Sequence, residues 1–142
     1  MVSPSVPPPG SASPSAAFDF QLSDDGVMVI RWNRTATPEE SRSLMDLIRR
    51  EWVLGRPYAC AMITHRDVNA DARHRKLWSD WHLENRPRIE RLCRGAVMTL
   101  DSPGIRALMT VLGWFSPTGY PVKYVATEEE AVRWARALMA RK

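Results

Sequence analysis

The chain has 142 residues, which is the usual length of one domain and is enough to enclose a hydrophobic core. Hydrophobic residues make up 44% of it and charged residues 25%, as in ordinary globular proteins, and the formal net charge is +4. No window approaches the roughly 18 apolar residues of a membrane-spanning helix. The first residues do not combine a basic segment with an apolar stretch, so we expect no signal peptide and a cytoplasmic protein.

The positive charge is concentrated in the middle of the chain. Residues 65–94 contain eight basic and five acidic side chains, a surplus of three. A surplus of this size is common on a solvated helix face, whereas nucleic-acid-binding domains usually carry a denser basic stripe. We therefore do not expect a nucleic acid partner.

The two cysteines, Cys60 and Cys93, lie in apolar runs without the Cys-x-x-Cys spacing of a metal or redox motif. We expect buried free thiols in a reducing compartment. His74 and His82 are eight residues apart, whereas histidine pairs that bind one metal ion are usually three or four residues apart. The sequence therefore predicts neither a metal site nor a cofactor.

Residues 1–17 hold five prolines and five serines and no charge, a composition that predicts a disordered arm. The folded domain is expected over residues 18–142. Its first part, residues 18–22 and 27–32, reads as two strands around Asp25-Gly26, a dipeptide typical of hairpin turns.

Helices and strands alternate over the rest of the chain. Thr37-Pro38-Glu39-Glu40 is a capping box at the start of a helix whose apolar stripe is Leu44, Leu47, Ile48 and Val53. A buried strand is expected at 58–64, and a long helix from residue 71 that Pro87 kinks or restarts and Gly95 ends. The last elements are expected to be a strand at 96–100, a helix at 102–113, an aromatic loop at 114–121, a strand at 122–125 and a capped helix from Thr127.

This order, ββαβαβαβα, predicts an α/β fold with a mostly parallel sheet and an N-terminal hairpin. The order and the closing segment Pro-Val-Lys-Tyr-Val-Ala-Thr-Glu-Glu-Glu-Ala-Val-Arg-Trp, residues 121–134, resemble the SpoIIAA-like families of the STAS-like group. The strand, short helix and aromatic turn of residues 95–114 are similar to them as well. The resemblance covers residues 18–140.

The resemblance implies a single STAS-like domain that acts as a non-enzymatic regulatory or scaffolding module. Its expected partner is another cytosolic protein or a second copy of the same chain. Some STAS domains are switched by phosphorylation of a Ser or Thr at the start of the helix after the third strand. Residues 64–71 contain no serine there, and Thr64 is expected to end a buried strand, so the sequence gives little support to such a switch.

Two groups of residues are candidates for binding. The partner-binding candidates are the aromatic and basic side chains of the long helix and of the late loop: Arg73, Arg75, Trp78, Trp81, His82, Trp114, Phe115 and Tyr120. The other interpretation of these rings is that they simply cover the sheet. Anion-binding candidates lie where ligands of open α/β sheets gather, beyond the carboxyl ends of the strands: Arg34, His65, Arg66 and Ser102.

No set of residues specifies a reaction. Ser102 lacks a nucleophile elbow, and neither cysteine has a histidine close in sequence, so we do not expect an enzyme. The alternative function is binding of a small molecule or lipid headgroup by the strand-end loops and the aromatic loop 114–121.

Overall fold

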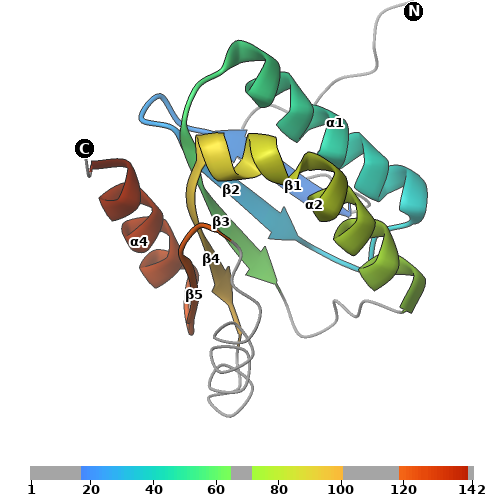
Figure 1. Cartoon of the computed structure of the whole chain (residues 1–142). Helices are drawn as coiled ribbons and strands as arrows, with labels where there is room; N and C mark the ends of the chain where they lie inside the picture. The colour runs from blue at the N-terminus through green and yellow to red at the C-terminus, as the bar shows by residue number, and fades with distance from the viewer. Residues whose placement is uncertain (1–16, 65–71, 101–118, 141–142) are drawn as a thin grey trace, which may run out of the picture.

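The computed structural model describes residues 17–64, 72–100 and 119–140, which build a twisted sheet with helices on both faces (Figure 1). The elements are β1 (Phe18–Leu22), β2 (Val27–Trp32), α1 (Pro38–Leu54), β3 (Tyr58–Thr64), α2 (Ala72–Leu92), β4 (Cys93–Thr99), β5 (Val122–Val125) and α4 (Glu128–Ala140). The five strands lie in the order β1-β2-β3-β4-β5. β1 is antiparallel to β2 and all other pairs are parallel, which confirms the expected fold class. The expected helix at 102–113 lies outside the described residues.

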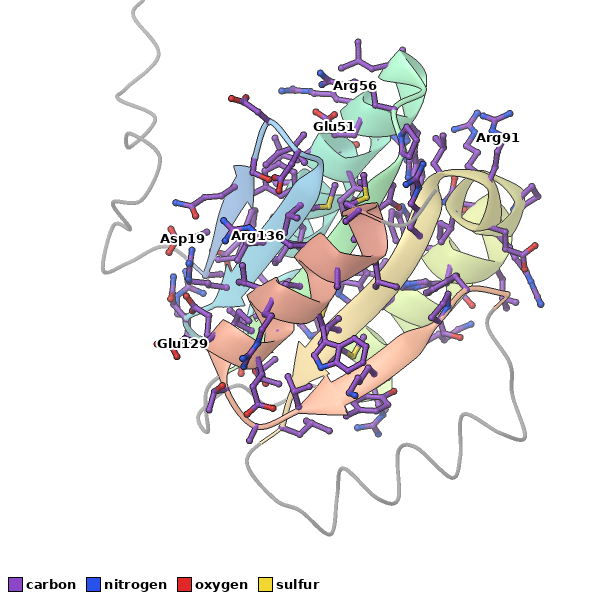
Figure 2. The ribbon with its side chains drawn as sticks, turned by 90° about the vertical axis from the view of Figure 1, so that its left-hand side faces the viewer. Asp19, Glu51, Arg56, Arg91, Glu129 and Arg136 are labelled. Carbon is purple, nitrogen blue, oxygen red and sulfur yellow. The ribbon has the colours of Figure 1, made fainter. Side chains whose placement is uncertain are left out.

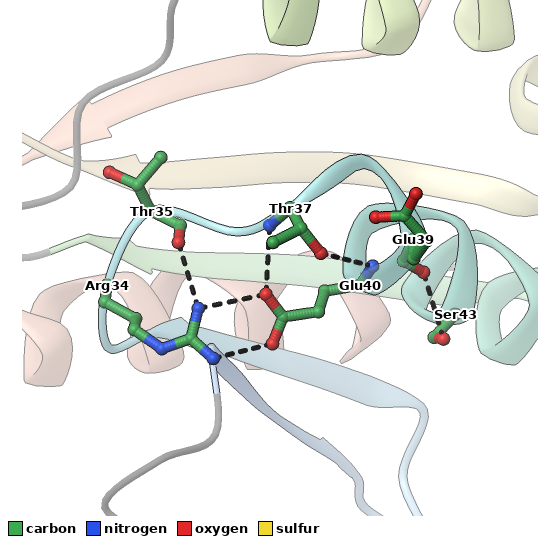
Figure 3. A network of polar contacts seen from close by, with 6 residues as sticks. All are labelled: Arg34, Thr35, Thr37, Glu39, Glu40 and Ser43. Carbon is green, nitrogen blue, oxygen red and sulfur yellow. Dashed lines mark hydrogen bonds and ion pairs between the residues drawn. The ribbon is translucent and has the colours of Figure 1, made fainter.

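Helix α1 begins as its sequence predicts (Figure 3). The backbone N–H of Glu40 donates to the Thr37 hydroxyl (3.2 Å), and the Glu40 carboxylate accepts from the backbone N–H of Thr37 (2.9 Å). Arg34 reaches the same carboxylate with two N–H groups, at 2.9 and 2.7 Å. The helix ends at Gly55, whose φ of 71° is the left-handed conformation that glycine tolerates best. Ala17, assigned to the arm by sequence, is buried, and its carbonyl accepts from Asn33.

Two sequence expectations for the helices were wrong in detail, and of the kink or restart expected at Pro87 the restart is absent. Val53 is 80% exposed, because the neighbouring Trp52 takes the inward position of that turn. Helix α2 does not restart but continues through Pro87, which lacks the N–H that would bond to the carbonyl of the exposed Leu83. Gly95 does not end the helix; β4 begins directly after α2, and Gly95 lies within it.

The two faces of the sheet carry side chains of different size. On the face covered by α4, the inward residues of β2, β3 and β4 are small or β-branched: Val27, Val29, Ala59, Ala61, Ile63 and Val97. They meet Ala131, Ala135 and Leu138 of α4. A Cβ at Gly95 would lie 2.5 Å from Leu138 Cδ1, so the absence of a side chain there lets α4 approach closely. Figure 2 shows α4 lying directly across the strands.

The opposite face carries long side chains, among them Met28, Ile30, Trp32 and Tyr58, which pack with α1 and α2. Strand alternation sorts the residues this way, because successive side chains point to opposite faces. Helix α4 has Cα atoms close to β2, β3, β4 and β5, whereas α2 approaches β4. The layer formed by α1 and α2 is therefore held away from the sheet by bulky side chains.

Candidate functional site

A cavity of about 320 Å³ lies between the sheet and the layer of α1 and α2. Its floor is formed by alternate residues of three neighbouring strands. Met28 lies beside Cys60, which pairs with Ala96, and Ile30 lies beside Met62, which pairs with Met98. Methionine and cysteine are polarizable side chains, and methionine adapts to irregular shapes. The floor is therefore apolar and can adjust to an occupant.

The roof is supplied mainly by one face of α2. His74, Trp78, Trp81, His82 and Ile89 all line the cavity, and their spacing of three, four or seven residues places them on the same side of a helix. Helix α1 adds Ser41 and Ile48.

The indole rings of this roof are braced by further tryptophans. Trp81 stacks on Trp52, with ring centroids 5.1 Å apart and an interplanar angle of 21°. Trp78 meets Trp32 edge to face at 6.0 Å and Trp81 edge to face at 5.3 Å. The Trp52 N–H donates to the buried Tyr58 hydroxyl at 3.0 Å. The Trp78–Trp32 contact joins α2 to the sheet, and the Trp81–Trp52 stack joins α2 to α1.

The cavity runs along the strands toward their carboxyl ends. Trp32 and Thr64 are the last residues of β2 and β3, and Thr35 follows β2; all three line it. Thr64 is fixed there because its backbone N–H donates to the Thr99 hydroxyl at 3.0 Å. In open α/β sheets this edge is where ligands usually bind. Tyr58 and Cys93 line the opposite end of the cavity.

Burial keeps the acidic groups of the cavity in their neutral forms. It raises the pKa of the Cys93 thiol to about 11 and that of the Tyr120 hydroxyl to about 12, and it raises the pKa values of Cys60 and Tyr58 well above their usual range. A thiol must lose its proton to act as a nucleophile, so both cysteines are poor nucleophiles at neutral pH. Among the described lining residues none is Asp, Glu, Lys or Arg.

The structure separates the sequence-predicted partner-binding residues into two groups. Trp81 is 7% exposed and Trp78 is half-buried, so these rings face the cavity rather than forming a surface patch. His82 and Tyr120 line the same cavity. Arg73 and Arg75 are exposed on α2. Trp114 and Phe115 lie outside the described residues.

Of the four anion-binding candidates, Arg34 alone lies in the described part of the chain. Arg34 is engaged by Glu40 in the two-point contact that Figure 3 shows. His65, Arg66 and Ser102 lie outside the described residues. No cluster of three or more metal-ligating side chains was found in residues 17–64, 72–100 and 119–140.

Sequence reasoning missed the floor of the cavity. The signal lay in the strands, where Tyr58, Cys60 and Met62 alternate with the small Ala59 and Ala61. This alternation of long and short side chains indicates that helices pack closely on one face of the sheet and at a greater distance on the other. Ser41 was also missed, although it stands three and seven residues before Leu44 and Ile48, a spacing that places it on the apolar stripe of α1.

The fold that frames this cavity is STAS-like, of the SpoIIAA-like type, as the sequence resemblance implied. A solved structure that shares it is an uncharacterized protein of the DUF3478 family with a SpoIIAA-like fold, from Shewanella loihica PV-4. The two chains are 15% identical and superpose with a TM-score of 0.58 over 84% of this chain and 92% of the other. No family model matches the sequence, and neither does any curated protein. Within the described parts of the chain, no helix is both long and apolar enough to cross a bilayer.

Proposed function

We propose that the protein binds an apolar small molecule in the cavity between the sheet and helices α1 and α2. The observation that carries this proposal is the cavity itself, about 320 Å³ in volume and lined by methionine, tryptophan and aliphatic side chains. An apolar cavity of about 150 Å³ already binds benzene. The space here is roughly twice as large, which suits a bicyclic or medium-chain molecule.

The location of the cavity supports the same proposal. Close packing is the rule in protein interiors, so an apolar pocket of this size between two layers of a small domain is unusual. The tryptophan contacts that hold α2 off the sheet preserve the space in a layer that could otherwise close. Because both cysteines are free and buried, we propose that this binding takes place in the cytoplasm, where thiols stay reduced.

The test is to fill the cavity with protein atoms. Ala96 forms part of the floor, so Ala96→Leu should occupy the space and raise the unfolding free energy of the unliganded protein by about 1 kcal/mol, or roughly 3 °C in Tm. The same variant should lose binding of the bicyclic hydrocarbon tetralin, measured as the ligand-induced rise in Tm. The matched control is Ala137→Leu on the exposed side of α4, which should leave binding unchanged.

Two results would count against the cavity. If tetralin stabilises Ala96→Leu as much as it stabilises the wild type, then tetralin binds somewhere other than the cavity. A wild-type protein that is not stabilised by any apolar probe of this size has no such ligand site.

A second candidate function is regulation through contact with another cytosolic protein. The observation that favours it is the outer face of α2, where Leu83 is 66% exposed about one turn before the exposed Arg86 and about two turns after the exposed Arg75. Exposed leucine and arginine together are typical of protein-binding surfaces. An acidic partner, or an acidic surface on a second copy of the chain, would complement the positive charge of these arginines.

This candidate is tested by reversing the charge of that face. A protein captured in near-stoichiometric amount by the wild type should be lost from the double variant Arg75→Glu, Arg86→Glu. It should be retained by the control Arg133→Glu on α4, which carries the same kind of change on the opposite layer. Equal capture by all three proteins would exclude α2 as the interface.

A further inference from the structure

The hydroxyl oxygen of Ser41 and the indole nitrogen, Nε1, of Trp81 are buried side-chain atoms without a hydrogen-bond partner within the described structure. Ser41 is 0% exposed and Trp81 is 7% exposed, and both residues line the cavity. A buried donor without a partner is costly to the folded state and is uncommon in native proteins.

The neighbouring indole shows that the fold can satisfy such a group. Trp52 stacks on Trp81 in the same cluster, yet the Trp52 N–H has the Tyr58 hydroxyl as its acceptor at 3.0 Å. Trp81 has no such partner among the described residues. Because Trp81 lines the cavity, a ligand seated there is the group that can supply an acceptor for this N–H.

The charge of the cavity limits what this acceptor can be. The described lining residues include no Lys or Arg, and the buried thiols and phenols stay neutral because their pKa values are raised. An ionised group moved from water into such a place loses hydration that nothing there replaces. Two histidines, His74 and His82, also line the cavity. A neutral oxygen faces a much smaller penalty and gains a hydrogen bond.

The geometry points to a ligand that is uncharged and mainly apolar and that carries a hydrogen-bond acceptor, such as a carbonyl or ether oxygen, for the Trp81 N–H. The Ser41 hydroxyl is the second polar contact available to it. This inference rests on the proposed function, because it assigns a ligand class to the same cavity.

The experiment compares three probes that share one bicyclic skeleton. Tetralin is the hydrocarbon, α-tetralone adds one carbonyl, and tetralin carboxylic acid adds an ionised group. Dissociation constants are measured by calorimetry for the wild type, Trp81→Phe and Trp78→Phe. Trp78→Phe is the matched control, because it removes the same atoms from a second ring in the roof of the cavity but leaves the Trp81 N–H in place.

In the wild type, α-tetralone should bind at least as tightly as the more hydrophobic tetralin, and the acid should bind more weakly than the ketone. Trp81→Phe should weaken α-tetralone relative to tetralin by roughly fivefold, the loss expected for one hydrogen bond. Trp78→Phe should leave this ratio unchanged. Using the ratio removes any general loss of affinity that both probes share. If Trp81→Phe does not fold, Ser41→Ala carries the same comparison.

The outcomes separate the inference from the proposed function. The inference is overturned if tetralin binds and the ratio of the dissociation constants of α-tetralone and tetralin is the same in the wild type, Trp81→Phe and Ser41→Ala. The proposed apolar site would then still stand. An acid that binds as tightly as the ketone overturns the uncharged ligand class. Failure of all three probes to bind the wild type overturns the proposed function itself.

Discussion

At the scale of single residues, a polar contact contributes differently to stability on the surface and in the cavity. Glu40 holds two N–H groups of Arg34 and the backbone N–H of Thr37, and these contacts lower the pKa of its carboxyl to about 2, with the Arg34 bond as the largest cause. The pair is largely solvated, so water screens much of its energy. Trp81 Nε1 and Ser41 Oγ are buried without a hydrogen-bond partner, and one missing partner costs more there than a surface ion pair contributes.

The Glu40 contact predicts a pH dependence of stability. A carboxyl whose pKa is lower in the folded state than in the unfolded state stabilises the fold above the unfolded pKa, and this stability is lost as pH falls toward the folded value. Glu40→Gln, which keeps the capping bond, should lower the free energy of unfolding at pH 7 by about 0.5–1 kcal/mol. The difference in unfolding free energy between Glu40→Gln and the wild type should shrink as pH falls from 4.5, the unperturbed pKa of the Glu40 carboxyl, to 2.5.

Urea unfolding at pH 7, 4.5 and 2.5 measures this difference. Glu39→Gln is the control, because Glu39 is exposed in the same helical turn and the contact drawn for it in Figure 3 is from its backbone carbonyl to Ser43. A Glu40→Gln difference that is as large at pH 2.5 as at pH 7 would show that the ion pair is not its cause.

At the scale of secondary structure, sequence reasoning succeeded where local chemistry decides. The hairpin around Gly26 and the capping box at Thr37 depend on residues within a few positions of each other, and both are present. It failed at the exit from α2, where Leu138, more than forty residues further on, occupies the space beside Gly95. Burial that depends on another element, as for Trp81 against Trp52 of α1, cannot be deduced from the segment itself.

At the scale of the whole molecule, the two layers around the sheet are unlike in a way that sequence alone only hinted at. One layer is close-packed on alanine, valine and glycine, and the other is held open by methionine and tryptophan. The fold class could be predicted because strand and helix order define it. The cavity could not, because its volume depends on the spacing that the Trp32–Trp78 contact sets between β2 and α2 and on the Trp52–Trp81 stack that joins α2 to α1.

This difference predicts where a ligand stabilises the molecule. Parts of a protein that pack around a void open at lower free energy than close-packed parts, and a ligand that binds only the closed form suppresses that opening. In hydrogen exchange followed by mass spectrometry, tetralin at about 100 times its Kd should slow exchange in α2 by up to about a hundredfold. Exchange in α4 should slow much less. In Ala96→Leu, whose cavity is filled, tetralin should not slow exchange in either helix. Equal slowing in α2 and α4 would mean that the two layers open together, and that the void creates no separate unit of lower stability.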